Sequence, residues 1–536
     1  MTATTTDSQL SGKQPGLPAS SPKGITPVSA SMVLVLFMTA LHLILAFKAE
    51  LGGDEAHYAL YGLMPDWSYF DHPPMVGWLQ IIPMWLAPYD WSARLVPITL
   101  YVLLNGLLYQ VTVQLFSSAQ HNREWSNASE LDPNYRWIGF WSLVLLNTSL
   151  LLPLMGMAML PDNPLMVVTL ALILVVIKLL KTDQFKYWIA LGLLVGLAGL
   201  SKYTAVTLVV SLLLLMAVEN RFYWLRQKGL WIAIAIAIAM MSPVLYWNAI
   251  HDWASFIYQI DHGTKSDFWS WARVGKTQLI QFASYTPLLF LLGWWAMLNP
   301  KHYRHAGSRL LLLFSLPITV LFFWGSGYEE SLPHWVSLAW LLLIPIIVYQ
   351  LWSLRQRIWV KALTAVQIVL FGGFTLLMHS LLFSPWIAVA DHQNPVQGDY
   401  GWPTATQTAL ELQKQHATPE HPLPLFVPNW SIASHLAWYA RPQPVYITSA
   451  KQTQFEFWYG RATEGMDGIL VAPHFEQNPP MTGTANHFKR CDLLKKQPIS
   501  ANGAIIVTYH FYHCQHFLTE TAPVPSAKSP QKDMGT

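Results

Sequence analysis

The chain has 536 residues, of which 53% are hydrophobic and only 11% are charged, whereas soluble domains carry roughly 25% charged residues. A formal net charge of +3 is too small in a chain of this size to indicate a nucleic-acid-binding protein. The two cysteines, Cys491 and Cys514, are too few for a multi-cysteine zinc site or an iron–sulfur cluster.

Residues 1–29 are rich in Ser, Thr, Pro and Gly, and we expect a disordered tail because such a segment buries too little apolar surface to fold. Apolar stretches then recur up to residue 383, separated by short clusters of Lys and Arg. About 20 apolar residues span a bilayer as a helix, so the pattern predicts an all-α, multi-pass membrane domain over residues 30–384. The eleven predicted spans are 31–47, 94–116, 137–153, 163–181, 187–200, 203–218, 230–248, 277–299, 309–325, 335–352 and 359–383.

The stretch 187–218 is divided into two spans because a single helix would be about 48 Å long, against about 30 Å of hydrocarbon. Ser201, Lys202 and Tyr203 interrupt it. With this division, the loops on one side hold fourteen Lys and Arg and those on the other side hold five. By the positive-inside rule, we expect the amino terminus in the cytoplasm and the segment after residue 384 on the outer side of the membrane.

The composition changes after residue 384, where short alternating apolar runs at 444–447 and 503–509 are typical of strands. We therefore predict a small mixed α/β extracytoplasmic domain over residues 385–519 and a disordered tail over 520–536. Both cysteines fall in this domain, in an oxidising compartment, and we predict a disulfide between them. The alternative is two free cysteines whose backbones lie too far apart.

The first outer loop, residues 48–93, is long, and long loops in compact proteins are usually functional or disordered. It is too aromatic for disorder, and its Trp and Tyr residues are typical of an element at the membrane interface. Asp54 and Glu55 directly follow Gly52 and Gly53 at the outer end of the first span. Carboxylates at such a position are costly to desolvate, which indicates a functional role.

Two motifs of this loop closely resemble the first outer loop of bacterial membrane glycosyltransferases of the GT-C type, relatives of protein O-mannosyltransferases and of the lipid A aminoarabinose transferase. They are Gly53-Asp54-Glu55-Ala56-His57-Tyr58 and the run from Asp66 to Leu79, which contains Asp71-His72-Pro73-Pro74. The resemblance spans about residues 30–385 and continues in a fixed order through residues 94–97, 159–164, 199–204, 242–248, 253–256 and 332–335. It is weaker in the C-terminal domain, at 429–431 and 454–458.

The resemblance implies inverting transfer of a sugar from a polyprenyl-phosphate donor to an acceptor outside the membrane, which is a glycolipid such as lipid A, a polysaccharide or a protein. An acceptor hydroxyl needs a carboxylate to take its proton, and the anionic candidates are Asp54, Glu55 and Asp162. In this family the first acidic residue of the loop is the usual base, which corresponds to Asp54. A leaving phosphate needs cations or hydrogen-bond donors; the predicted donor-phosphate and substrate-binding residues are Lys202, Tyr203, Arg94, Asp71, His72 and His334.

Each residue also has a simpler interpretation. Asp162 stands where a helix N-cap is expected, Lys202 could extend toward the lipid headgroups, and Arg94 could pair with a loop carboxylate. His72 could serve only in loop hydrogen bonds. No fixed ligand spacing supports a metal site, so we expect no metal and no other cofactor. Separately, we expect the protein to be a monomer.

Two other functions compete with transfer. A secondary transporter usually buries its ionisable groups near the membrane midplane and often shows internal repeats. Here the charges gather at one face, and no repeat is present in the sequence. A non-catalytic membrane protein of cell-envelope assembly would not require the acidic pair Asp54-Glu55.

Overall fold

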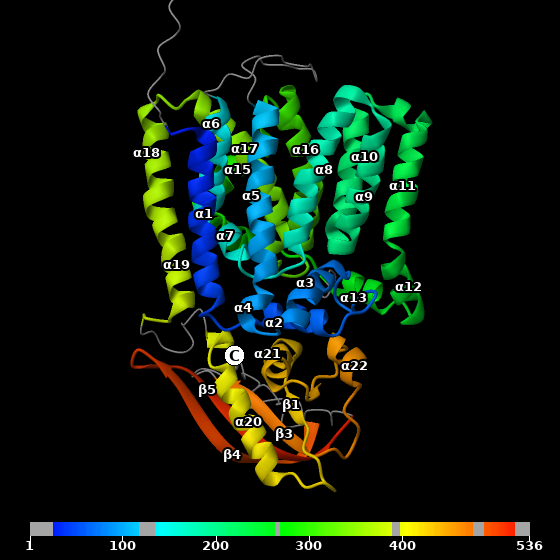
Figure 1. The fold of residues 1–536 in the computed structure, drawn as a ribbon, viewed down its shortest axis with the longest axis vertical. Coiled ribbons are helices and arrows are strands. Elements are labelled where there is room, and N and C mark those ends of the chain that lie inside the picture. Colours follow the sequence, from blue (N-terminus) through cyan, green and yellow to red (C-terminus); the bar gives the residue numbers. More distant parts are fainter. Residues whose placement is uncertain (1–24, 117–134, 263–267, 388–396, 475–486, 520–536) are drawn as a thin grey trace, which may run out of the picture.

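A computed structural model describes residues 25–116, 135–262, 268–387, 397–474 and 487–519. A bundle of long helices carries a smaller α/β domain against one end (Figure 1). Residues 1–24 of the predicted tail 1–29, and all of the predicted tail 520–536, lie outside the described residues. Helix α1 begins at Pro27, within the segment expected to be disordered. Its start is fixed by Thr26, whose hydroxyl accepts a hydrogen bond from the backbone N–H of Ser29 at 3.1 Å.

The helices of the bundle are apolar on most of their surface, as expected for segments in contact with lipid or with one another. Helix α17 is central, because every residue from Ser337 to Val348 is buried. The helices are α1 Pro27–Ala46, α5 Leu95–Phe116, α6 Arg136–Thr148, α7 Leu151–Met155, α8 Asp162–Thr182, α9 Phe185–Ser201, α10 Val206–Val218, α11 Lys228–Met240, α12 Ser242–Ile250, α13 Ala254–His262, α14 Trp271–Ser284, α15 Thr286–Leu298, α16 Ala306–Gly325, α17 Ser337–Ser353, α18 Ile358–Val366 and α19 Gly373–Phe383.

Within the described residues, six helical stretches are long and apolar enough to cross a membrane, or seven if the bent pair α11 and α12 counts as one span. The predicted count of eleven is therefore not confirmed. Several predicted spans are shorter helices, such as α6, α9, α10 and α15, and the stretch 277–299 is broken at Tyr285 between α14 and α15. The division of 187–218 is confirmed, because α9 ends at Ser201 and Lys202 has an extended backbone.

The 48–93 loop folds into three short helices, α2 Gly53–Leu63, α3 Met75–Leu86 and α4 Asp90–Ala93. They lie across the end of the bundle that faces the C-terminal domain (Figure 1). Helix α3 buries Val76 and Gln80 on one face and exposes the apolar side chains of Ile82 and Trp85 on another. This arrangement agrees with the interfacial element predicted for the loop.

The C-terminal domain has a five-stranded sheet of order β2-β1-β3-β5-β4. Strand β1 pairs in parallel with β2 and β3, whereas β5 is antiparallel to β3 and β4. The strands expected at 444–447 and 503–509 are confirmed as β2 and the start of β5. The elements are α20 Trp402–His416, β1 Leu425–Val427, α21 Trp430–Ala440, β2 Val445–Ile447, α22 Gln454–Tyr459, β3 Gly468–His474, β4 Phe488–Ala501 and β5 Ala504–Phe517.

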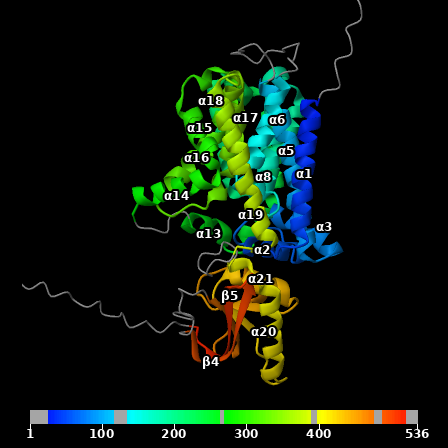
Figure 2. The same ribbon diagram turned by 90° about the vertical axis from the view of Figure 1, so that its left-hand side faces the viewer.

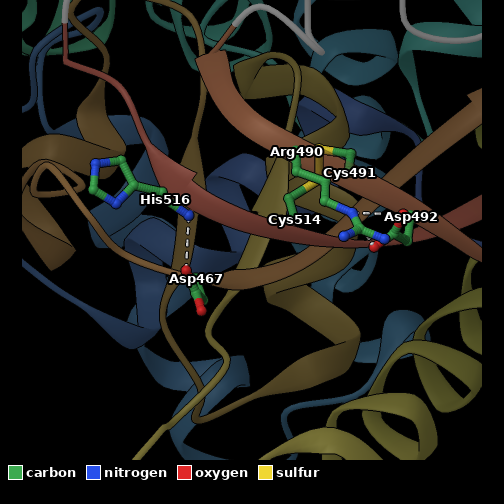
Figure 3. The surroundings of a disulfide bond; sticks show 6 residues. All are labelled: Asp467, Arg490, Cys491, Asp492, Cys514 and His516. Atoms are coloured by element: carbon green, nitrogen blue, oxygen red, sulfur yellow. Dashed lines mark hydrogen bonds and ion pairs between the residues drawn. A yellow bond between two sulfur atoms is a disulfide. The ribbon is translucent and has the colours of Figure 1, made fainter.

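The disulfide predicted between Cys491 and Cys514 is present and joins β4 to β5 (Figure 3). The two residues are directly opposite each other in the antiparallel ladder, and their α-carbons are 4.0 Å apart. The bond therefore crosslinks the edge strand β4 to the interior of the sheet.

The C-terminal domain lies against the 48–93 loop (Figure 2), and partly buried polar contacts join the two. The indole N–H of Trp438 and the hydroxyl of Tyr439 both donate to the carboxylate of Asp90, each at 2.7 Å. The backbone N–H of Trp402 donates to the Glu50 carboxylate at 3.0 Å. Helices α20 and α21 are thus held against the loop that carries the predicted catalytic residues.

Candidate active site

The first turn of α2 is ordered by a buried ion pair between Glu55 and Arg94. The Arg94 guanidinium donates two hydrogen bonds of 2.8 Å, one to each carboxylate oxygen of Glu55. It also donates to the backbone carbonyls of Glu50, at 2.7 Å, and Ala49, while Glu55 accepts from the N–H of Gly52 at 2.9 Å. Arg94 thus shows the simpler of its two predicted roles, which is to pair with a loop carboxylate.

Asp54 differs from its neighbour because, within the described part of the chain, none of the hydrogen bonds or ion pairs involves its carboxylate. The side chain is partly accessible. Burial raises the pKa of Asp54 to about 6, and the nearby carboxylates of Asp399, Asp71 and Glu55 act in the same direction while His57 opposes them. This carboxylate is ionised at neutral pH but holds a proton more tightly than an ordinary aspartate.

Asp71 is held by two aromatic side chains of α2. Its carboxylate contacts the ring nitrogen Nε2 of His57 at 3.2 Å and accepts a hydrogen bond from the Tyr61 hydroxyl. Burial opposes ionisation of Asp71, but the His57 ring and its hydrogen bond outweigh this effect and hold the pKa well below its ordinary value. The other ring nitrogen of His57 lies 3.1 Å from the hydroxyl of Ser434 on α21.

Asp162 and Lys202 form a second buried ion pair, with 2.7 Å between the ammonium nitrogen and a carboxylate oxygen. Pro161 occupies the N-cap position of α8 and Asp162 begins the helix without a side-chain cap, so capping is not its observed role. Lys202 is 7% exposed and points to Asp162 rather than toward headgroups. Next to it, the Tyr203 hydroxyl lies 2.6 Å from that of Ser255.

The two predicted histidines belong to the same cluster. Burial lowers the pKa of His72 to about 4, an effect opposed by the charge of Asp71 and increased by that of Lys202. His72 is therefore neutral at neutral pH and can donate one N–H. His334, in the turn that precedes α17, lies within electrostatic reach of Asp162, Lys202 and His72.

Tyr58 shows how closely the acidic residues gather. Burial raises the pKa of its phenol well above the ordinary value, and the charges of Asp54, Asp71 and Asp162 add to the effect. The structure thus brings Asp54, Asp71, His72, Asp162, Lys202 and His334 around one region, whereas Glu55 and Arg94 are engaged with each other. No group of three His, Cys, Asp or Glu side chains among the described residues has the arrangement of a metal site.

Three residues of this region were not predicted from the sequence, namely His57, Tyr61 and Ser434. His57 lies inside the motif that carries Asp54, and its position one helical turn further along was an available signal. Ser434 had no such signal, because it is 377 residues away from His57 in the chain. The only indication was the weaker resemblance around residues 429–431.

Comparisons with known proteins identify relatives of this chain. A family model described as dolichyl-phosphate-mannose-protein mannosyltransferase matches residues 134–247. The lipid A galacturonosyltransferase RgtD of Rhizobium johnstonii is 23% identical over 372 residues, which cover 67% of this chain and 73% of the relative.

Solved structures show the same fold. The crystal structure of ArnT from Cupriavidus metallidurans bound to undecaprenyl phosphate matches with a TM-score of 0.58 and 13% identity, over 90% of this chain and 97% of ArnT. Its apo state matches over the same shares with a TM-score of 0.55. Together with the motifs and the clustered site, these matches support the assignment of the chain to the membrane glycosyltransferases of the GT-C type.

Proposed function

We propose that the protein transfers a sugar from a polyprenyl-phosphate donor to an acceptor hydroxyl, with inversion at the anomeric carbon. The observation that carries this proposal is the environment of the Asp54 carboxylate. Of the four acidic residues predicted for the site, it alone lacks a hydrogen-bonding partner among the described residues, and burial raises its pKa to about 6. A base with a pKa close to the working pH is well suited to accept a proton in the transition state.

In the proposed step, the acceptor hydroxyl gives its proton to Asp54 while its oxygen forms a bond to the anomeric carbon. The bond between that carbon and the phosphate oxygen breaks on the opposite face. Its electron pair leaves with the polyprenyl phosphate. Glu55 is a positioning residue in this scheme, because its pairing with Arg94 fixes the first turn of α2.

The leaving phosphate requires cations or donors at the other side of the sugar. We assign this task to Lys202, His72 and His334, which lie within electrostatic reach of one another. An incoming phosphate would share the Lys202 ammonium with Asp162, in charge-assisted hydrogen bonds. The undecaprenyl phosphate bound to ArnT supports a lipid carrier of this class.

For the acceptor, we favour a glycolipid such as lipid A over a polysaccharide or a protein, because the curated relative is a lipid A galacturonosyltransferase. The donor sugar is a hexose or a pentose. We further propose that the chain acts as a monomer in the inner membrane without a metal, with a cytoplasmic amino terminus and a periplasmic C-terminal domain.

The direct test uses the full-length protein in lipid nanodiscs with lipid A and undecaprenyl-phosphate-linked sugars, and mass spectrometry of the products. We expect a glycosylated lipid A and an equal amount of free undecaprenyl phosphate. Comparison of envelope glycolipids from cells with and without the gene identifies the natural sugar. Release of sugar without any glycosylated product, or transfer that survives loss of Asp54, would contradict the proposal.

A further inference from the structure

A second concave region lies beside the site, where the C-terminal domain meets the turn between α12 and α13. This cavity of about 710 Å³ is within the range of ligand pockets. Its lining includes Phe70, Ile257, Tyr258, Lys451, Gln452 and Phe457. None of the residues assigned above to catalysis or to the donor phosphate lines it.

The two walls of the cavity differ in chemistry. On the side of α12 and α13, Ile250 and Ile257 are 56% and 52% exposed. They continue the apolar surface at the end of the bent pair α11 and α12, one of the candidate spans. On the other side, Lys451 and Gln452 come from the loop that precedes α22. The cavity therefore lies between a lipid-facing surface and a polar domain, and an amphipathic ligand would satisfy both.

The polar and aromatic groups indicate the kind of headgroup. The rings of Phe70 and Tyr258 lie 4.6 Å apart between centroids, and Phe457 lies 5.7 Å from Phe70. Asp252 and Asp261 are exposed at the same cavity, and within the described part of the chain no hydrogen bond or ion pair engages their carboxylates. Aromatic faces suit the apolar faces of sugar rings, and carboxylates accept hydrogen bonds from hydroxyls.

We propose that this cavity binds the saccharide headgroup of a glycolipid acceptor whose acyl chains remain in the bilayer. The inference rests on the proposed function and extends it by naming where the acceptor enters. It also favours an acceptor held in the membrane over a soluble polysaccharide or a protein.

The cavity is connected to the site through one stretch of backbone. Phe70 forms part of its wall, and the next residue is Asp71, whose carboxylate contacts His57 and Tyr61. Gln259 of α13 donates to the backbone carbonyl of Asp71 at 2.7 Å, and Gln454 of α22 accepts from the N–H of Phe70 at 2.7 Å. The elements that form the cavity thus hold the segment that carries Asp71, so a headgroup bound there lies next to the catalytic cluster.

Site-specific labelling tests the location directly. Because the chain has two cysteines and both are in the disulfide, the full-length Gln452→Cys variant presents a single reactive thiol at the cavity. The matched control is Lys414→Cys, an exposed position on α20 that does not line it. We expect saturating lipid A in nanodiscs to slow maleimide labelling of Gln452→Cys by about tenfold, as for a side chain covered by a ligand, and to leave Lys414→Cys unchanged.

The same labelling distinguishes the acceptor from the donor and does not depend on turnover. Protection by undecaprenyl phosphate instead of lipid A would make the cavity a donor site and overturn the proposal. Protection by a soluble polysaccharide or a peptide alone, or no protection at all, would also overturn it. A protein that transfers sugar to lipid A without protection at Gln452→Cys would refute the inference and leave the proposed function intact.

Kinetics provide the second measurement. The variants Phe457→Ala and Asp261→Asn should raise the KM for lipid A by about tenfold with little change in kcat or in the KM for the donor, because they remove binding that is equal in ground and transition states. Tyr446→Ala, at a partly exposed aromatic residue of β2 that does not line the cavity, is the control. Equal effects of all three variants would indicate damage to the domain and contradict a binding role.

Discussion

Glu55 and Arg94 face each other through two hydrogen bonds of equal length, 2.8 Å, from one guanidinium to the two oxygens of one carboxylate. Both side chains are buried, at 7% and 1% exposure. Adjacent side chains on a helix diverge by about 100 degrees, so the direction that satisfies Glu55 turns Asp54 away from Arg94. The pair of carboxylates is thereby divided into one that orders the loop and one that is available for chemistry.

The substitution Asp54→Asn should abolish transfer while the protein stays folded. It keeps the size of the side chain and removes the base, and general-base catalysis typically contributes about 100-fold to 10,000-fold to the rate. The check is the transfer rate of purified protein, together with donor binding, which should be unchanged. Near wild-type transfer by Asp54→Asn combined with an inactive but fully stable Glu55→Gln would move the base to Glu55.

Glu55→Gln should instead lower stability. The change leaves the buried Arg94 cation without its carboxylate, and breaking a buried pair by removal of one partner costs about 3–5 kcal/mol. We expect less folded protein and a lower midpoint in thermal unfolding followed by size-exclusion chromatography. The variant Glu55→Gln/Arg94→Gln removes both charges and should recover part of the stability, which would separate the electrostatic effect from a loss of packing.

Lys202→Met keeps much of the apolar stem of the side chain but leaves Asp162 as a buried, unpaired charge, again at a cost of about 3–5 kcal/mol. Loss of a cationic donor to the leaving phosphate should reduce transfer by about 100-fold or more. The double variant Asp162→Asn/Lys202→Met should be stable yet still inactive. Transfer restored along with stability in the double variant would show that Lys202 acts only in folding.

The rate of transfer should depend on pH with an acidic limb near 6. As the pH falls through the pKa of Asp54, which burial raises from an ordinary value of 3.8 to about 6, the base takes up a proton and the rate falls by about tenfold per pH unit. Burial also raises the pKa of Glu50, to about 7, so the profile of Glu50→Gln is the control. If the acidic limb disappears in Glu50→Gln, the titrating group is Glu50, whose carboxylate binds the backbone N–H of Trp402, and not Asp54.

Loss of the disulfide should loosen the C-terminal domain. The bond closes a loop with a sequence separation of 23 residues, for which the entropy of the unfolded chain predicts about 3 kcal/mol of stabilisation. We expect Cys491→Ser/Cys514→Ser to be cleaved faster by protease within residues 425–517, with the membrane domain intact. Unchanged cleavage would mean that the sheet holds β4 and β5 together without the bond.

The sequence was sufficient for features that depend on local pattern. Apolar stretches gave the helical bundle, the break at Lys202 divided α9 from α10, and the motifs marked Asp54, Asp71 and His72 as residues of one loop. Span number was less accessible, because a continuous apolar stretch does not reveal where a helix breaks inside the bundle. The break at Tyr285 between α14 and α15 is an example, although Pro287, two residues further on, was an available local signal.

The pairing of charges could not be predicted because it depends on contacts between distant segments. Arg94 is 39 residues from Glu55, and Lys202 is 40 residues from Asp162. Each had several possible partners at the same end of the bundle. The selection of one partner follows from the directions of α2, α5, α8 and α9, which only the folded chain defines. For the same reason, Ser434 could not be connected with His57.

The contact between α2 and α21 limits how the C-terminal domain can be exchanged between this protein and its relatives. A β-carbon added to Gly53 would lie 2.7 Å from the hydroxyl oxygen of Ser431 and 3.4 Å from Nε2 of His435. The Asp90 carboxylate accepts hydrogen bonds from Trp438 and Tyr439. A chimera that takes its C-terminal domain from a relative would therefore meet a mismatched surface at the start of α2. Residues 49–94 and 397–519 have to be exchanged as one cassette.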